Sequence, residues 1–454
     1  MTAAEIDRLT PPDRNRYADL LRLAAIVVVV AGHWLMAVLL VRDGRLSGAH
    51  LLTEVPATQW LTWVFQVMPL FFFVGGYANA TAWSSAEGRG TRYADWVRGR
   101  AHRLLSPVVP LLAAWVPLAA LLAAAGAPPD LLRMATQVVI VPTWFLAAYL
   151  VVVAAAPLTL AAHRRFGPGA FGALAAGAAV VDGLHRAGVP LVGWANFLLV
   201  WAAVHQLGYL WRDGRLPRGA ARGLGLAAAG FAGLALLTGP LGYAVSMVGV
   251  DGAARSNNSP PTIALVALGV AQVGLVVAAR TPVEALLRRP RIWAAVVVAG
   301  SRAMTVYLWH LSALVAVTGT LHATGLWSFT ADVDRTWWTT RPLWFALLAA
   351  ALAGLVALFG RFETAPAPPI ARTVGAATAL QLAAGVAATS AGLGLLAVGG
   401  LYTASGPFGI PVFPLALVLA GLTALGVVGG AGGGGRAGGG AARRPAGRAA
   451  GIAR

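Results

Sequence analysis

The chain has 454 residues, of which 58% are hydrophobic and only 11% are charged, with a net charge of +18 and a mean hydropathy of +0.73. Soluble domains carry about a quarter charged residues, so this composition excludes a soluble globular protein. Cysteine is absent, which excludes disulfides, thiolate metal sites and a cysteinyl-acyl intermediate.

Apolar runs of helical length predict an all-α fold, a polytopic transmembrane bundle of about twelve helices. Each run must be helical because lipid cannot satisfy exposed backbone N–H and C=O groups. The predicted helices, in chain order, are 18–42, 58–82, 103–126, 133–161, 169–184, 191–211, 223–249, 261–279, 292–320, 341–360, 374–402 and 411–430.

These helices predict four regions of the chain. Residues 1–17 form a short polar N-terminal segment, and residues 18–369 form a transmembrane core of ten helices. Residues 370–430 hold two additional helices that carry no charged residue. Residues 431–454 are mostly Gly, Ala and Arg, cannot bury a core, and are expected to be a disordered tail.

Arginine supplies every basic side chain, since the chain has no lysine, and it is unevenly distributed between the predicted loops. Apart from Arg22 and Arg302, which lie inside predicted helices, 25 arginines fall on the side of the N-terminus and 7 on the opposite side. Positive residues accumulate on the cytoplasmic side, so we expect a plasma-membrane protein with both termini in the cytoplasm. Topology and contact with anionic membrane lipids then explain the net charge, and no nucleic-acid partner is expected.

The first helix contains Asp19, Arg22 and His33. His33 comes eleven positions, about three helical turns, after Arg22, so the two share one face and lie roughly 16 Å apart along the axis. With Arg22 near the cytoplasmic interface, His33 is near mid-membrane, where ionisable groups are costly and normally face a protein interior or a water-filled cavity. The structural alternative is an interfacial Asp19–Arg22 ion pair with His33 as a hydrogen-bonded packing residue.

Several segments together resemble the acyltransferase-3 family of integral membrane acyltransferases, over about residues 14–369. Arg22 and His33, with ten residues between them, resemble its first-helix signature, and Gly75 stands where the family often has Ser. The other similar segments are Met68-Pro69-Leu70-Phe71-Phe72-Phe73-Val74-Gly75-Gly76-Tyr77, Arg100-Ala101-His102-Arg103, Thr143-Trp144-Phe145-Leu146, Val306-Tyr307-Leu308-Trp309-His310 and Arg361-Phe362-Glu363.

The resemblance implies transfer of an acyl group from acyl-CoA to a hydroxyl, often on a sugar. His33 is the candidate general base, because an imidazole kept from water is favoured in its neutral form and a positioned base contributes ~10²–10⁴-fold. Asp19 and Arg22 either orient the site or bind the donor, and both roles stay open. Acetyl-CoA is the expected donor and no metal is expected. The acceptor is expected to be a carbohydrate or lipid-linked molecule, and the oligomeric state is open.

Acyl-CoA is polyanionic, and Arg98, Arg100 and Arg103 are the candidates to bind it, because Arg makes forked hydrogen bonds to phosphate. Their alternative is ordinary positive-inside topology. Further candidates for substrate binding are Tyr77, Trp144, Tyr307, His310 and Glu363. Each also has a structural interpretation: the aromatic rings as interface anchors, His310 as a wet residue near the outer end of its helix, and Glu363 as an ion pair beside Arg361.

Two outer loops, 251–261 and 331–341, offer polar and aromatic side chains for acceptor contacts or for ordinary solvation. Buried His, Arg and Asp would also fit a proton-coupled transporter or flippase. Against transport, the charged residues concentrate in the first helix and not in matched halves. A non-enzymatic membrane scaffold would not need a deep His aligned with an Arg.

Overall fold

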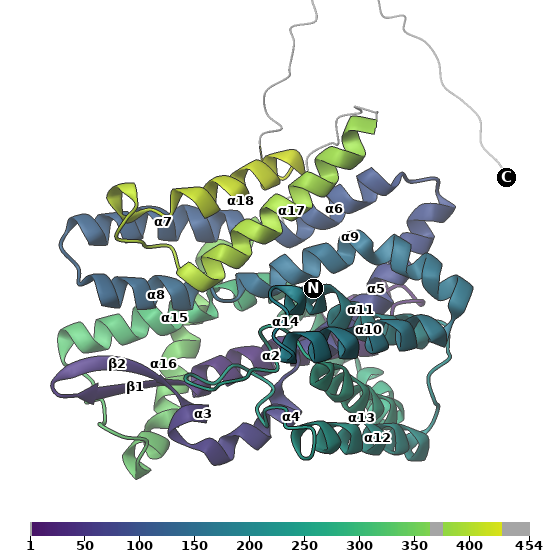
Figure 1. Ribbon diagram of the computed structural model, residues 1–454, viewed down its shortest axis with the longest axis horizontal. Helices are drawn as coiled ribbons and strands as arrows, with labels where there is room; N and C mark the ends of the chain where they lie inside the picture. Colours follow the sequence, from purple (N-terminus) through teal and green to yellow (C-terminus); the bar gives the residue numbers. More distant parts are fainter. Residues whose placement is uncertain (1, 364–375, 429–454) are drawn as a thin grey trace, which may run out of the picture.

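The computed structural model describes residues 2–363 and 376–428, and it forms a bundle of helices with one short hairpin of strands (Figure 1). Each of the predicted helices contains helical structure in its described part. The long helices are α2 (Arg16–Met36), α5 (Met68–Gly88), α6 (Tyr93–Leu105), α7 (Val108–Ala124), α8 (Pro129–Ile140), α9 (Thr143–Phe166), α10 (Pro168–Arg186), α11 (Asn196–Arg212), α12 (Ala220–Thr238), α13 (Ile263–Leu287), α14 (Pro290–Gly300), α15 (Ala303–Thr324), α16 (Arg335–Phe359), α17 (Ala376–Gly399) and α18 (Val412–Ala424).

Within the described residues, eight helical stretches are long and apolar enough to cross a membrane, or nine if the bent pair α6 and α7 counts as one span. The expected number was about twelve. Four predicted helices are not among the eight. α11 has 17 residues and α18 has 13, so both are short for a span; α10 has 19 residues but is less apolar, and the fourth corresponds to the bent pair α6 and α7. The all-α polytopic fold is confirmed, with fewer full-length spans than the hydropathy of the sequence predicts.

The predicted end of the first helix, at residue 42, is wrong. α2 ends at Met36, and the chain then forms an antiparallel hairpin. Strand β1 (Ala37–Arg42) pairs with β2 (Arg45–His50). The turn between them is Asp43-Gly44, and both residues have positive φ (52° and 71°), which is the two-residue connection that right-twisted strands prefer. The apolar run of β1 extended the helical hydropathy signal and hid this turn.

Proline breaks three other predicted helices. Ser106-Pro107 separates α6 from α7 with a bend of 45°, and Pro142 separates α8 from α9. Pro240 follows the end of α12 at Thr238, where the prediction continued to residue 249. Proline has no backbone N–H and removes a hydrogen bond from the α-helical ladder, which favours a break at these positions.

Small residues let core helices approach closely. A Cβ atom added to Gly76 in α5 would lie 2.0 Å from the carbonyl oxygen of His205 in α11, and one added to Gly208 would lie 2.1 Å from that of Phe73. No side chain fits at either position. Glycine therefore fixes the α5–α11 contact, as small residues do between membrane helices.

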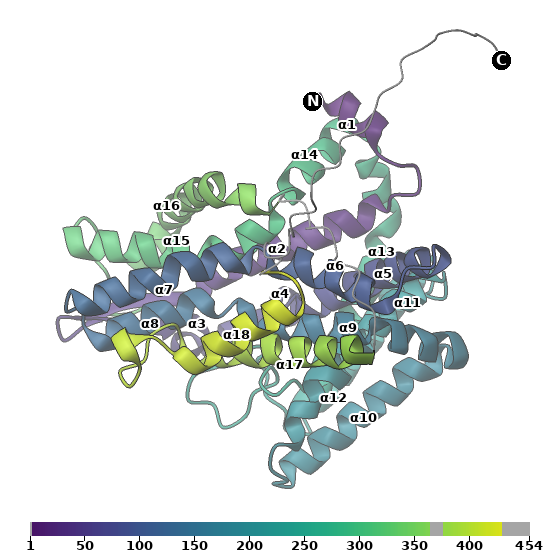
Figure 2. The same ribbon diagram turned by 90° about the horizontal axis from the view of Figure 1, so that it is seen from above.

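The first and last described helices lie on different parts of the bundle. α1 (Ala3–Leu9) packs on α14, where the indole nitrogen of Trp293 donates to the Thr10 hydroxyl at 2.7 Å, and the two helices project together (Figure 2). α17 pairs with α18 and packs on α9, where the Ser390 hydroxyl donates to the Ala147 carbonyl at 3.0 Å. Arg372 and the predicted disordered tail lie outside the described residues.

Candidate active site

His33 and His310 form a buried imidazole pair. Nδ1 of His33 lies 2.7 Å from Nε2 of His310, and the two rings stack with their centroids 5.0 Å apart. His310 is completely buried and is the eighth residue of α15, so it is not near the outer end of its helix as expected. The expectation failed because the predicted helix began at residue 292, whereas α15 begins at Ala303.

Hydrogen bonding fixes the tautomers of this pair. Nδ1 of His310 is 2.6 Å from the carbonyl oxygen of Tyr307, which can only accept, so this nitrogen carries a proton. In the neutral His310 ring, Nε2 is then the acceptor for the N–H at Nδ1 of His33. The remaining nitrogen of His33, Nε2, keeps its lone pair and can accept a proton.

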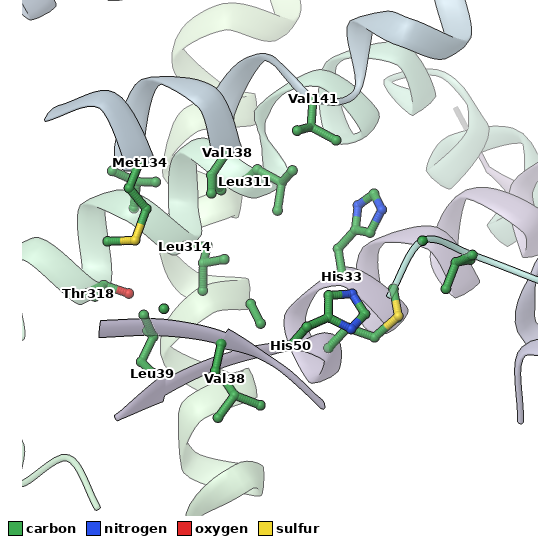
Figure 3. A pocket seen from close by; sticks show the side chains of 18 of the residues that line it. His33, Val38, Leu39, His50, Met134, Val138, Val141, Leu311, Leu314 and Thr318 are labelled. Atoms are coloured by element: carbon green, nitrogen blue, oxygen red, sulfur yellow. The ribbon is translucent and has the colours of Figure 1, made fainter. Parts of the chain in front are cut away.

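The pair borders a pocket of about 540 Å³ that runs between α2, the hairpin, α8 and α15 (Figure 3). His33 lines this pocket and stays partly exposed, whereas His310 lies behind it. Trp144 and Tyr307, two of the predicted substrate-binding residues, also line the pocket. Tyr307 is held there because its hydroxyl donates to the carbonyl of Pro142, at the break between α8 and α9, at 2.8 Å.

Tyr77 and Glu363 are not among the residues that line this pocket. Tyr77 packs its ring against Trp211, with centroids 4.7 Å apart. Glu363 accepts hydrogen bonds from the backbone N–H groups of Met304 and Thr305 at 3.1 and 2.9 Å, and from the Thr305 hydroxyl at 2.6 Å. Its carboxylate therefore caps the first turn of α15, a role that the sequence interpretation as a surface ion pair missed.

Asp19 and Arg22 form an ion pair, about three to four helical turns before His33. The Asp19 carboxylate bonds Nη2 of Arg22 at 2.9 Å and Nε of Arg14 at 2.7 Å. The Arg22 side chain is 48% exposed and the Asp19 side chain 17%. The predicted ion pair is present, and the structure separates these two residues from the imidazole pair at the other end of α2.

Of the three arginines predicted to bind the donor, Arg100 is the most enclosed. All three lie on α6; Arg98 is half-buried and Arg103 is exposed. The Arg100 guanidinium lies over the Trp96 ring at 5.5 Å and reaches the carbonyl oxygen of Ala78 at 3.5 Å. Both Arg100 and Arg22 are within electrostatic reach of the Tyr149 hydroxyl. Arg22 of α2 and Arg100 of α6 therefore both act electrostatically on Tyr149.

Gly75 makes room for that tyrosine. A Cβ atom at Gly75 would lie 2.7 Å from the Tyr149 hydroxyl oxygen, so a serine could not be accommodated without moving the ring. The same hydroxyl accepts a hydrogen bond from Asn79 at 3.2 Å, and Asn79 also contacts His205 at 3.1 Å. These buried polar groups bond across helices, as polar side chains in membrane bundles do.

His50 is a pocket residue that the sequence analysis missed. It ends β2, and its Nδ1 accepts from the backbone N–H of Leu52 at 3.4 Å, so Nε2 carries the proton. Burial lowers the pKa of His50 below its ordinary value, which keeps the ring neutral. The Asp-Gly turn could have revealed the hairpin, and with it the return of His50 towards His33 (Figure 3).

The two loops that were predicted to lie outside the membrane, 251–261 and 331–341, differ in their relation to the pocket. Asp251 and Asn258 of the first loop line it. In the second loop, Asp332 pairs with Arg42 at 3.3 Å, and Asp334 caps α16 by accepting from the N–H of Trp337 at 2.8 Å. The second loop therefore uses these carboxylates structurally. Among the described residues, no group of three or more His, Asp or Glu is placed to hold a metal ion.

The fold and this site define a multi-pass helical membrane protein with a histidine site inside the bundle. A sequence model of the family described as an acyltransferase domain matches residues 15–360, so the chain belongs to the acyltransferase-3 family and is a membrane acyltransferase. The match ends before α17. No curated protein and no solved structure gives a significant match to the chain.

Proposed function

We propose that the protein transfers an acyl group from cytoplasmic acyl-CoA to a hydroxyl of an extracytoplasmic or membrane-embedded acceptor, such as a glycan or glycolipid, with His33 as the general base. The observation that carries the proposal is the chain of hydrogen bonds from Tyr307 through His310 to His33, which leaves a proton-accepting nitrogen in a ring that borders the pocket. A hydroxyl is a poor nucleophile until such a base removes its proton.

In the reaction, the acceptor oxygen attacks the thioester carbonyl carbon while its proton passes to Nε2 of His33. His310 accepts a hydrogen bond from the other nitrogen of His33 and so stabilises the imidazolium that forms. When the tetrahedral intermediate collapses, the carbon–sulfur bond breaks and His33 returns the proton to the departing sulfur. The products are the O-acylated acceptor and free coenzyme A.

His50 adds a hydrogen-bond donor to the same pocket. Its Nε2–H is the free polar group of a neutral ring whose Nδ1 is already bonded to the backbone. Such a donor suits the oxyanion that develops on the thioester oxygen, because preorganised donors in a site without water stabilise developing charge strongly.

The donor enters from the side where α2 begins. Arg22 and Arg100 supply cations there, and guanidinium groups bind phosphate with two parallel hydrogen bonds. With both termini in the cytoplasm, this basic region faces the compartment that holds acyl-CoA, and the pocket lies on the acceptor side of His33.

The test compares wild-type protein with His33→Gln and His185→Gln in inside-out membrane vesicles given acyl-CoA that is labelled in its acyl group, as acetyl and as dodecanoyl thioesters. We expect His33→Gln to lower label transfer by about 10²–10⁴-fold. His185 is exposed on α10 and serves as the matched control, with transfer unchanged. Undiminished transfer by folded His33→Gln protein would refute His33 as the base.

A further inference from the structure

The pocket beside His33 has two chemically different ends. His33 and His50 bring ring nitrogens to one end (Figure 3). At the other end, Leu39 of β1, Met134 and Val138 of α8, and Leu314 of α15 point towards a common space (Figure 3). Three separate elements therefore build an apolar compartment that continues from the imidazole pair.

This compartment is longer than an acetyl group. Thr318, at its far end, lies eight residues beyond His310 on α15, which is roughly 12 Å along the helix axis. The whole pocket, at about 540 Å³, falls in the range of about 300–1,000 Å³ that is typical of sites for whole small molecules. Protein interiors rarely leave such space empty, because it forfeits packing contacts.

The walls do not suit a sugar. A sugar ring carries several hydroxyls, and each one removed from water needs a hydrogen-bonding partner. The Thr318 hydroxyl is the one polar group among the labelled side chains at this end, and its buried oxygen has no partner within the described structure. His322, which also lines the pocket, lies one turn further along α15 and is exposed. Methylene groups, in contrast, gain free energy on transfer from water into such a surface.

We propose that this apolar end, bordered by Leu39, Met134, Val138 and Leu314, binds a hydrocarbon chain of a substrate whose reacting group lies at His33. The inference rests on the proposed function, which places the reaction at His33. Two substrates could carry the chain: an acyl-CoA with an acyl group much longer than acetyl, or an acceptor that joins a hydroxyl-bearing head group to an alkyl tail.

The experiment labels the pocket directly, without depending on turnover. Full-length protein in nanodiscs is irradiated with one of three probes that carry a terminal diazirine: dodecanoyl-CoA, dodecyl glucoside or a phosphatidylcholine. Labelled peptides are then identified by mass spectrometry. We expect label on β1, α8 and α15 from the coenzyme A probe if the donor carries the chain, or from the glucoside if the acceptor does.

Two variants and a control connect the label to this compartment. Val138→Phe narrows it and should reduce the label at least fivefold, while Leu314→Ala widens it and should move the preferred chain length upward. Leu121→Ala on α7, a site 68% exposed, changes side-chain volume away from the pocket and should leave the label unchanged. Because Leu314→Ala only removes atoms, it also tests the proposal if Val138→Phe fails to fold.

The outcomes separate this inference from the proposed function. Absence of label in the compartment from both substrate probes, or equal label from the phosphatidylcholine, would overturn the hydrocarbon site, whatever the protein transfers. Specific label together with undiminished acyl transfer by His33→Gln would instead keep the hydrocarbon site and refute His33 as the base.

Discussion

The indole nitrogen of Trp34 donates a hydrogen bond of 3.0 Å to the backbone carbonyl of His310. The neighbouring side chain, His33, meets the imidazole of the same residue at 2.7 Å. Consecutive residues of α2 therefore hold both the main chain and the side chain of one residue in α15. This double contact sets the relative height of the two helices, and so the geometry of the imidazole pair.

Replacing Trp34 by Phe tests this positioning role. The variant keeps an aromatic ring beside Phe345 and removes the hydrogen bond to His310, so we expect a loss of about 1 kcal/mol in unfolding free energy. Transfer should fall several-fold in kcat with little change in KM for acyl-CoA, because the arginines proposed to bind the donor lie away from Trp34, towards the start of α2. Trp60→Phe, at a 56% exposed position, is the control. Equal effects of the two substitutions would contradict the role of Trp34.

His310→Phe tests the second ring of the pair. Phenylalanine fills a similar space but cannot accept the hydrogen bond that Nδ1–H of His33 donates to His310, so His33 loses its orientation and the partner of its imidazolium form. We expect kcat to fall by about 10²-fold, within the range contributed by a positioned base. The pH profile of kcat should also shift, which a purely structural defect would not cause. An unchanged profile in folded protein would mean that His310 only packs.

Glu363→Ala separates a structural role from substrate binding. Its carboxylate satisfies two backbone N–H groups at the start of α15, and loss of such a cap costs about 1–2 kcal/mol. We expect a lower thermal midpoint together with normal KM and kcat for the protein that remains folded. Glu284→Ala removes an exposed i, i+4 pair with Arg280 and should cost only a few tenths of a kcal/mol. A raised KM for either substrate in Glu363→Ala would place the residue in the binding site instead.

Much of the helical fold follows from the sequence, because a long apolar run in lipid has few alternatives to a helix. His33 could be predicted as a candidate because an ionisable group so far into an apolar run costs free energy, and such groups normally serve a function. The pairing with His310 could not be predicted, since it depends on how α15 packs against α2. His50 was missed for a local reason: the hydropathy of Val38 to Val41 fits a helix as well as a strand, and only Asp43-Gly44 distinguishes them.

Gly76→Ala tests the close approach of α5 and α11. The added methyl group would meet the His205 carbonyl at 2.0 Å, so the helices must separate, and overpacking of this kind costs about 1–3 kcal/mol. Gly225→Ala on α12 is the matched control, because a Cβ there meets nothing within 4 Å and alanine is the better helix former. Thermal unfolding in detergent should show a clear loss for the first variant and no loss for the second. Equal thermal midpoints for the two variants would show that α5 and α11 can move apart without a loss of stability.

His50 makes stability depend on pH with a predictable sign. Burial holds its pKa in the folded protein below the ordinary value, although the nearby Asp251 carboxylate acts in the opposite direction. As pH falls through about 6.5, the unfolded chain takes up a proton at this residue that the folded protein does not, so His50 makes folding less favourable in acid.

His50→Asn isolates this contribution. Asparagine can still accept from the N–H of Leu52 and is a good helix cap, so the hairpin and α3 (Leu51–Glu54) should keep their structure. We expect wild type and variant to have similar thermal midpoints at pH 7.5, and the variant to be the more stable of the two at pH 5.5. A difference of the opposite sign would mean that the protonated ring is stabilised in the folded state. The attraction between the Asp251 carboxylate and the imidazolium of His50 would then outweigh the cost of burying that charge.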